Sequence, residues 1–297
     1  MSLVAETISE AFSEFLRKKT PRAWEREEVG KYRTRIYEVL NSEFEVYNFF
    51  QSGSFSNGTG ISQVSDVDYF ARIPLSRKTA RPESFLSSMR GVLEKGLWEA
   101  FEVRVSRPTV SIDFKRLVTQ YEVTPGFYER SGSNGEDVFL IPGPGGTWRE
   151  SAPKAHLQYV READSLHSGK VKGLARLLKA WKYEHGIPVS SFYLEMRAAQ
   201  YGMQVDNILY PSALPELVDR MVSHSVRAMN DPTGLVNRIT ACSSEANRLA
   251  TIRAMNRCLP HLEEGYAQWA VDDWAASSEY QEVFGSDFPY VLKVGNA

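Results

Sequence analysis

The spacing of hydrophobic residues divides the chain into a first part that mixes helices with strands and a second part that is mainly helical. Residues 3–18 place Val4, Ile8, Phe12 and Phe15 three or four positions apart, which predicts an amphipathic helix, and residues 29–44 predict a second one. Alternating apolar residues predict strands in the runs VYNFF, VDYFARI, FEVRVS and TVSIDFKRLV. A helix is predicted at residues 83–96.

The run IPGPGGTW marks the change between these two parts. Its proline and glycine density predicts irregular structure, and strand signals largely stop beyond it. Val171, Leu174, Leu178 and Trp181 then form one helical stripe, and residues 217–229, 244–258 and 262–276 predict further helices. We therefore expect an α/β (α+β) protein with a mixed-sheet domain at residues 1–160 and a helical domain at residues 161–297.

Composition and charge exclude several classes of function. Lys plus Arg number 35 and Asp plus Glu number 37, so no positive field favours constitutive binding of duplex nucleic acid. No run of about 18 apolar residues predicts a membrane span. Cys242 and Cys258 form no CxxC pair and have no histidine at ligand spacing, which argues against a zinc site and favours a reducing, cytoplasmic setting.

The run SGSFSNGTGISQVSDVDYF contains the residues that best predict chemistry. In a strand, Asp66 and Asp68 project from one face while Val67 and Tyr69 project from the other. Two close carboxylates repel each other unless a cation lies between them, so the pair favours a site for a hard metal ion. An isolated acid-apolar-acid triplet is more often a solvated turn, but this one has further acidic and glycine-rich partners.

Asp113, in the alternating run VSIDF, is the third predicted acid. Three carboxylates can hold two Mg²⁺ ions roughly 3.5 to 4 Å apart, with Mn²⁺ able to substitute, and Asp113 is the candidate proton acceptor. The preceding Gly53-Ser54 is expected to form a turn whose backbone and hydroxyl bind phosphate oxygens. Together these residues predict phosphoryl transfer.

The ordered combination of Gly-Ser, Asp-Val-Asp and a later acid resembles the DNA polymerase β-like nucleotidyltransferase superfamily. The runs GTWRESAPKAHLQYV and KVKGLARLLKAWKYEHGIPVSSFYLE make it similar to the cGAS/DncV-like nucleotidyltransferases of bacterial antiphage signalling. The resemblance implies a bilobed fold with the active site in its cleft. It also implies that nucleoside triphosphates are joined into a cyclic di- or trinucleotide messenger with release of pyrophosphate.

The same resemblance implies roles for residues of the second part. Lys179 and Ser191 match family positions that contact the donor triphosphate, and Phe192 stands where relatives often stack a tyrosine on the base. Helical spacing places Lys172, Lys179 and their neighbours Arg176 and Tyr183 on one face, away from the leucine stripe. Such a face is also compatible with a merely solvated surface.

Two other activities share these motifs: a linear oligonucleotide synthetase, and a nucleotidyltransferase toxin that modifies tRNA or protein. A catalytically silent nucleotide-binding regulator is a third alternative. We expect a monomer. Some relatives are joined to a conjugating partner protein through a small-residue C-terminus, and the mobile end expected at Gly295-Asn296-Ala297 would suit such a partner or would be a frayed end.

Overall fold

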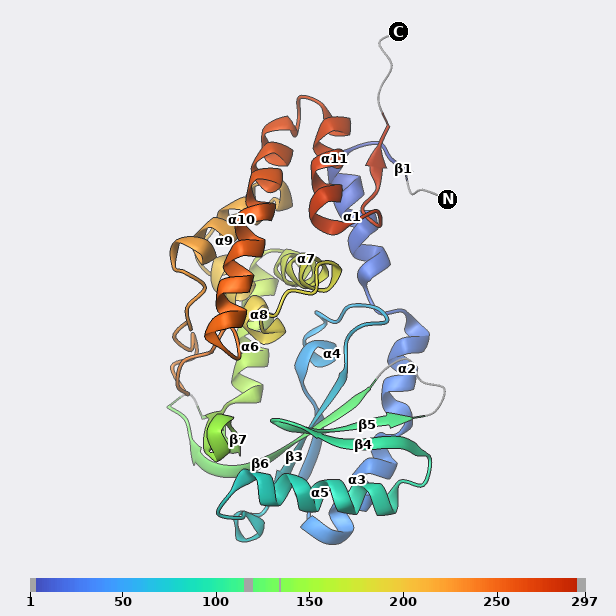
Figure 1. The fold of residues 1–297 in the computed structure, drawn as a ribbon, viewed down its shortest axis with the longest axis vertical. Coiled ribbons are helices and arrows are strands. Elements are labelled where there is room, and N and C mark those ends of the chain that lie inside the picture. Colours follow the sequence, from blue (N-terminus) through green and yellow to red (C-terminus); the bar gives the residue numbers. More distant parts are fainter. Residues whose placement is uncertain (1–3, 115–119, 134, 293–297) are drawn as a thin grey trace. The chain divides into compact units, whose positions relative to one another are not determined.

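The computed structural model describes residues 4–114, 120–133 and 135–292. The C-terminal Gly295-Asn296-Ala297, expected to be mobile, lies outside the described residues. The chain divides into two compact units. We call Pro21–Tyr159 with Thr233–Asn237 the strand unit, and Met1–Thr20, Val160–Pro232 and Arg238–Ala297 the helical unit. The predicted fold class, α/β with a mixed sheet and a helical part, is confirmed (Figure 1).

The helical unit is built mainly from helices, and its longest connection, residues 224–244, leads from α9 to α10. Its two short strands, β1 (Val4–Ala5) and β9 (Tyr290–Val291), pair in parallel. Its helices are α1 (Ile8–Lys19), the larger part of α6 (Pro153–Leu166), α7 (Lys170–Glu184), α8 (Ser191–Gly202), α9 (Tyr210–Ser223), α10 (Glu245–Gln268) and α11 (Asp273–Phe284).

Helix α1 groups with the helical unit, whereas residues 1–160 as a whole were predicted to belong to the mixed-sheet domain. The Phe12 ring lies 4.8 Å from the Tyr280 ring and 5.1 Å from the Phe288 ring, and Phe15 lies 5.2 Å from Phe284. The predicted stripe is therefore confirmed at Ile8, Phe12 and Phe15, whereas Val4, predicted to share this helix, lies in strand β1. The partners of α1 lie near the other end of the chain, so local spacing could not reveal them.

The strand unit contains a mixed sheet with the strand order β2-β3-β6-β5-β4. Strands β3 and β6 are parallel and the other paired neighbours are antiparallel. The elements are α2 (Ala23–Lys31), α3 (Arg33–Phe44), β2 (Asn48–Gln51), α4 (Gly53–Asn57), β3 (Val67–Ile73), a 3-10 turn (Leu75–Arg77), α5 (Pro82–Gly96), β4 (Ala100–Ser106), β5 (Thr109–Phe114), β6 (Tyr121–Ser131), β7 (Asp137–Pro142) and β8 (Trp148–Ser151).

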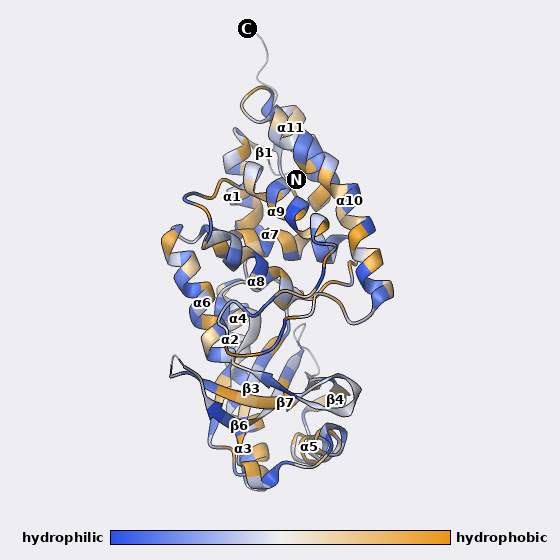
Figure 2. Cartoon of the chain, turned by 90° about the vertical axis from the view of Figure 1, so that its left-hand side faces the viewer, coloured by the Kyte–Doolittle hydropathy of each residue, from blue (hydrophilic) through white to orange (hydrophobic). Residues whose placement is uncertain are grey.

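Helices α3 and α5 pack along one face of this sheet, and the core of the unit lies between them and the strands (Figure 1). Phe85 of α5 contacts Phe44 of α3 and Phe127 of β6, with ring centres 5.1 Å and 5.0 Å apart. Apolar stretches run along the strands in Figure 2, while the helices alternate between polar and apolar residues. One face of each strand is therefore committed to this core. The other face carries polar side chains such as Asp68 and also a smaller apolar cluster of Phe70, Phe139 and Ile141.

Several predicted elements differ from the structure. Residues 141–148 are not irregular, because β7 and β8 pair from Phe139 to Ser151 around a 3-10 turn at Pro144–Gly146. Gly145 and Gly146, with φ of 65° and 74°, make that tight turn possible. Helix α10 continues through Pro260 to Gln268, so it joins the helix predicted at residues 244–258 to the first part of the one predicted at 262–276, whose last part belongs to α11. In place of the one helix predicted at residues 29–44, the structure has two, α2 and α3.

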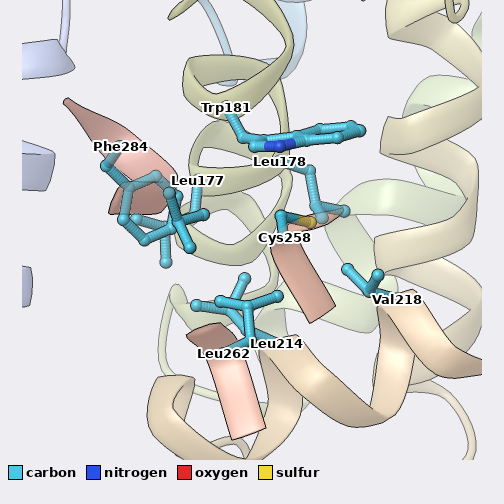
Figure 3. Close-up of a pocket in the computed structure, with 9 residues that line it drawn as sticks. Leu177, Leu178, Trp181, Leu214, Val218, Cys258, Leu262 and Phe284 are labelled. Carbon is cyan, nitrogen blue, oxygen red and sulfur yellow. The ribbon is translucent and has the colours of Figure 1, made fainter. Parts of the chain in front are cut away.

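A small cavity lies inside the helical unit among side chains of α7, α9, α10 and α11 (Figure 3). Its volume is about 10 Å³ and its lining is apolar, including Trp181, Leu262 and Cys258. Burial raises the pKa of the Cys258 thiol to about 12, so this cysteine is a core side chain and not a nucleophile. The cavity is a packing gap of the core. Within the described residues, no helix is long and apolar enough to cross a membrane.

Candidate active site

The two predicted aspartates lie at the start of strand β3, Asp66 directly before its first residue and Asp68 as its second residue, with Asp68 on the face opposite the core. Val67 and Tyr69 are 0% and 1% exposed, while Asp66 is exposed and Asp68 is partly buried. This is the alternation that the sequence predicted. Because Val67 and Tyr69 are fixed in the core, the two carboxylates have a defined direction.

Helix α4 lies directly against Asp68. The sequence predicted a Gly53-Ser54 turn in a polar loop, but the structure shows both residues in the first turn of this short helix. Gly53 has a φ of +61°, and a Cβ there would stand 1.9 Å from Oδ2 of Asp68. The Ser52 N–H donates to the Asp68 carbonyl over 2.9 Å. A side chain at position 53 would therefore displace the Asp68 carboxylate.

A buried carboxylate fixes the loop between α4 and the aspartates. Glu25 of α2 is 2% exposed and accepts hydrogen bonds from Ser62 Oγ at 2.9 Å and from the Gln63 N–H at 2.8 Å. It also accepts from the Arg22 N–H at 2.7 Å. Gln63 has a φ of +62°, so this loop adopts a conformation that needs such an anchor. No pattern in the sequence had pointed to Glu25.

Strand β6, which was not predicted from the sequence, adds a fourth acid. Glu122 is the register partner of Asp68 on β3 and of Ser111 on β5, so the three residues form one row across the sheet. Neighbouring strands lie about 4.8 Å apart, and side chains in one row share a face. Ser111 Oγ lies 3.2 Å from Glu122 Oε1. Burial raises the pKa of Glu122, opposed more weakly by hydrogen bonds from Ser111 and Thr109.

The alternation Tyr121-Glu122-Val123 is the signal that could have identified this residue. Tyr121 and Val123 are 1% and 0% exposed, so an acid stands between two core residues, as Asp68 does between Val67 and Tyr69. The prediction of a third acid had applied this argument to Asp113 alone.

Asp113 lies one strand farther from the aspartate pair, because β6 separates β5 from β3. Its carboxylate accepts from Arg104 at 2.5 Å and from Gln120 Nε2 at 2.8 Å. The ion pair with Asp113 also raises the pKa of the Arg104 guanidinium. The structure therefore places Asp113 on the same face as Asp66 and Asp68, but beyond Glu122 and engaged by Arg104.

The described part of the chain contains no close cluster of three or more His, Cys, Asp or Glu side chains already shaped as a metal site. Carboxylates without a cation between them repel each other, so an acid set that binds a metal need not be gathered beforehand. The donor chemistry nevertheless fits Mg²⁺. Asp66, Asp68 and Glu122 offer only hard oxygen ligands, from two adjacent strands and on one face.

In the helical unit, Lys179 is buried and not on an exposed face as its helical spacing predicted. It is 1% exposed, and its Nζ donates to Glu195 Oε2 of α8 over 2.6 Å. Both partners are nearly inaccessible, which makes this a buried ion pair between α7 and α8. The triphosphate contact expected for Lys179 stays a prediction. Lys172, on the same helix, pairs with Asp164 at 3.1 Å.

Ser191 is the first residue of α8, as the resemblance implied, and its hydroxyl meets a different lysine. Lys182 Nζ donates to Ser191 Oγ over 2.6 Å, and the Tyr183 hydroxyl lies 3.4 Å from the same atom. Phe192, next in the chain, is 40% exposed, so part of its ring is accessible for stacking. Lys182 could have been recognised because it follows Lys179 by about one helical turn.

Comparison with known proteins identifies the family to which this chain belongs. The Second Messenger Oligonucleotide or Dinucleotide Synthetase domain matches residues 7–164, more than half of the chain. The chain belongs to this family. The resemblance to cGAS/DncV-like nucleotidyltransferases is thereby confirmed, as is the assignment as a cyclic oligonucleotide-synthesising nucleotidyltransferase.

Individual relatives are distant but match along most of their length. The chain is 21% identical to the cyclic AMP-AMP-AMP synthase of Escherichia coli strain MS 115-1, over 89% of this chain and 90% of the relative. It is 19% identical to a probable cyclic nucleotide synthase of Bacillus cereus strain VD146, over 80% and 81%. The solved structure of E. coli MS115-1 CdnC with ATP has a TM-score of 0.74 at 18% identity, covering 94% of this chain and 98% of CdnC.

Proposed function

We propose that this synthetase joins ribonucleoside triphosphates into a cyclic di- or trinucleotide, with release of pyrophosphate, using Mg²⁺ held by Asp66, Asp68 and Glu122. The observation that carries the proposal is the row formed by Asp68 and Glu122 on adjacent parallel strands, with Asp66 two residues before Asp68 on the same face. Gly53 supports it, because the absence of a side chain there leaves room for the Asp68 carboxylate.

The chain's own residues have separate tasks in this proposal. Magnesium, when bound, would polarise the transferred phosphate and lower the pKa of the attacking ribose hydroxyl. Lys182 and Ser191 supply a cation and a hydroxyl for the donor phosphates, and the Phe192 ring stacks on a base. Asp113, predicted as a metal ligand and proton acceptor, remains a candidate whose charge is balanced by Arg104.

Substrate and setting are also proposals. ATP is supported as one substrate by the E. coli relative named cyclic AMP-AMP-AMP synthase and by the CdnC structure with ATP. Use of at least one adenine was also expected from the sequence. A cytoplasmic antiphage signalling role follows from the resemblance. A regulatory partner protein is supported by the solved complex of E. coli CdnC with HORMA-deltaN, a structure of TM-score 0.73.

The test is incubation with four labelled ribonucleoside triphosphates and Mg²⁺ or Mn²⁺, followed by phosphatase, nuclease digestion and mass determination. We expect a phosphatase-resistant product that contains adenine. Phosphatase-sensitive products would instead establish a linear synthetase, and labelled tRNA or protein would establish a modifying toxin.

The double variant Asp66→Asn with Asp68→Asn should make no product while keeping its melting temperature, because it removes two repelling charges. The exposed Asp206→Asn is the matched control. Product from the double variant at the wild-type rate would overturn the proposed site.

A further inference from the structure

Strand β4 ends the sheet and offers an open hydrogen-bonding edge. It pairs with β5 on one side, and within the described residues no strand pairs with its other side. Glu102 and Arg104 are exposed and pair with each other at 2.9 Å within the chain, a contact that pairing with a second copy would exchange for one between copies. The nearby Trp98 and Phe101 are 80% and 70% exposed. An edge strand without proline or lysine, flanked by exposed aromatic residues, is a template for another strand.

The sequence of β4 is complementary to itself in one antiparallel register. If Val103 lies opposite Val103 of a second copy, Glu102 lies opposite Arg104 of that copy, and Arg104 opposite its Glu102. Opposite charges in directly facing positions stabilise a strand pair, and the two-fold axis creates two such pairs. Moving the centre by one position to Arg104 would set two arginines against each other, so charge favours the Val103 register.

We propose that two copies of this chain associate through β4, antiparallel and centred on Val103. Val103 is 8% exposed and anchored in the core, so β4 is a preformed strand that loses little conformational entropy on pairing. In this register facing residues point to the same side of the combined sheet, so the acid faces of both copies continue one another. The monomer expected from the sequence would then be the dissociated form.

The alternative explanation is that the same features protect the edge. A β-bulge interrupts the register between Ala100 and Glu102, and exposed charges commonly prevent edge-to-edge pairing. The two explanations differ in what the charges do: protective charges act against any partner, whereas complementary charges select one register.

The experiment is sedimentation velocity and static light scattering of the full chain and two charge-reversed variants, Glu102→Arg and Arg104→Glu, from about 1 µM to about 500 µM. We expect a wild-type dimer of micromolar-range affinity, because the strand contact is short. Each variant alone should weaken association about tenfold or more, since reversal sets like charges opposite each other twice. Mixed in equal amounts, the variants should form a heterodimer, because both facing pairs become attractive again.

The mixing step also separates lost pairing from misfolding, because misfolded variants would not recover on mixing. Arg104 contacts Asp113, so its variant is assessed by mass and not by catalysis. A wild-type chain that stays monomeric throughout this concentration range would overturn the proposal and support the protective explanation. Dimers that survive Glu102→Arg alone would overturn the Val103 register. Neither outcome bears on the proposed synthetase activity, which is measured separately.

Discussion

Gly53 and Asp68 are packed so that only a residue without a side chain fits at position 53. A Cβ there would lie 1.9 Å from the Asp68 Oδ2 and 2.5 Å from its Cγ, well inside van der Waals contact. The φ of +61° is a second, independent reason for glycine. The Gly-Ser motif therefore does more than approach phosphate, because it leaves space for a carboxylate of the acid face.

Gly53→Ala should abolish synthesis, since the new methyl group must push the Asp68 carboxylate from its place. Gly234→Ala is the matched control: Gly234 has a similar φ of +68°, and a Cβ added there would meet nothing within 4 Å. Both variants should lose about 1 kcal/mol of folding stability from backbone strain. Product formation and thermal unfolding measure the two effects, and equal activity in the two variants would contradict the steric argument.

Glu122→Gln should remove nearly all activity, while Asp113→Asn should retain most of it, because only Glu122 lies in the row of Asp68. The measurement is the rate of pyrophosphate release across a Mg²⁺ titration. The opposite ranking would restore Asp113 as the third acid. It would mean that Glu122 on β6 takes no part in binding the metal.

The pH dependence of folding stability should show whether the Glu122 carboxylate is buried. Because burial raises its pKa, the folded protein holds this proton more tightly than the unfolded chain. Its contribution to stability is therefore complete below the ordinary glutamate pKa and is lost as pH rises through the raised value. Glu122→Gln should flatten this decline in denaturant unfolding curves. A slope identical to the wild type would mean that the carboxylate is solvated.

The two lysines of α7 should respond differently to substitution. Lys182→Ala should raise the KM for nucleotide with little change in melting temperature, since its Nζ meets Ser191 at a partly accessible position. Lys179→Met should destabilise the fold by about 3 kcal/mol, because it leaves Glu195 buried without its cation. If Lys179→Met raises the KM in a fully folded enzyme, the family role implied for Lys179 holds here.

Glu25→Gln should slow synthesis without displacing nucleotide, because it weakens the anchor of the loop that precedes Asp66. An amide can replace only some of the contacts that the carboxylate accepts from Arg22, Ser62 and Gln63. Hydrogen exchange at the Gln63 amide should accelerate, and kcat should fall more than KM rises. The exposed Glu27→Gln is the control on the same helix. Unchanged protection of Gln63 would remove the anchoring role.

Local patterns predicted what depends on local chemistry. The alternation at Asp66-Val67-Asp68 and helix α5 both follow from residues close in sequence, whereas the placement of Ser191 at the start of α8 was implied by the family resemblance. Strand β6 was missed because it contains Pro125 and Gly126, which normally weaken a strand prediction. Here the Phe70 ring covers Gly126, so close that a Cβ would lie 2.0 Å away. Such a contact depends on pairing between β3 and β6 and is invisible in either segment alone.

The sequence also could not show which charged side chains pair across neighbouring helices. Helical spacing placed Lys179 on the face away from the leucine stripe, with a solvated surface as one alternative. In the structure Lys179 is buried and forms an ion pair with Glu195 on the next helix. The partly exposed Lys182 was overlooked for the same reason, since spacing within one helix does not indicate which face its neighbour covers.

The placement of α1 has a consequence for how the chain is made. Its aromatic residues pack against Tyr280, Phe284 and Phe288, and the Ile8 N–H donates to Asp273, 265 positions later, at 3.0 Å. A nascent chain must therefore keep the apolar stripe of α1 uncovered until residues 273–288 have been translated, while most of the strand unit can fold earlier. Nascent chains stalled before residue 273 should hold a formed sheet together with a chaperone-accessible first helix, because the partners of α1 have not yet been synthesised.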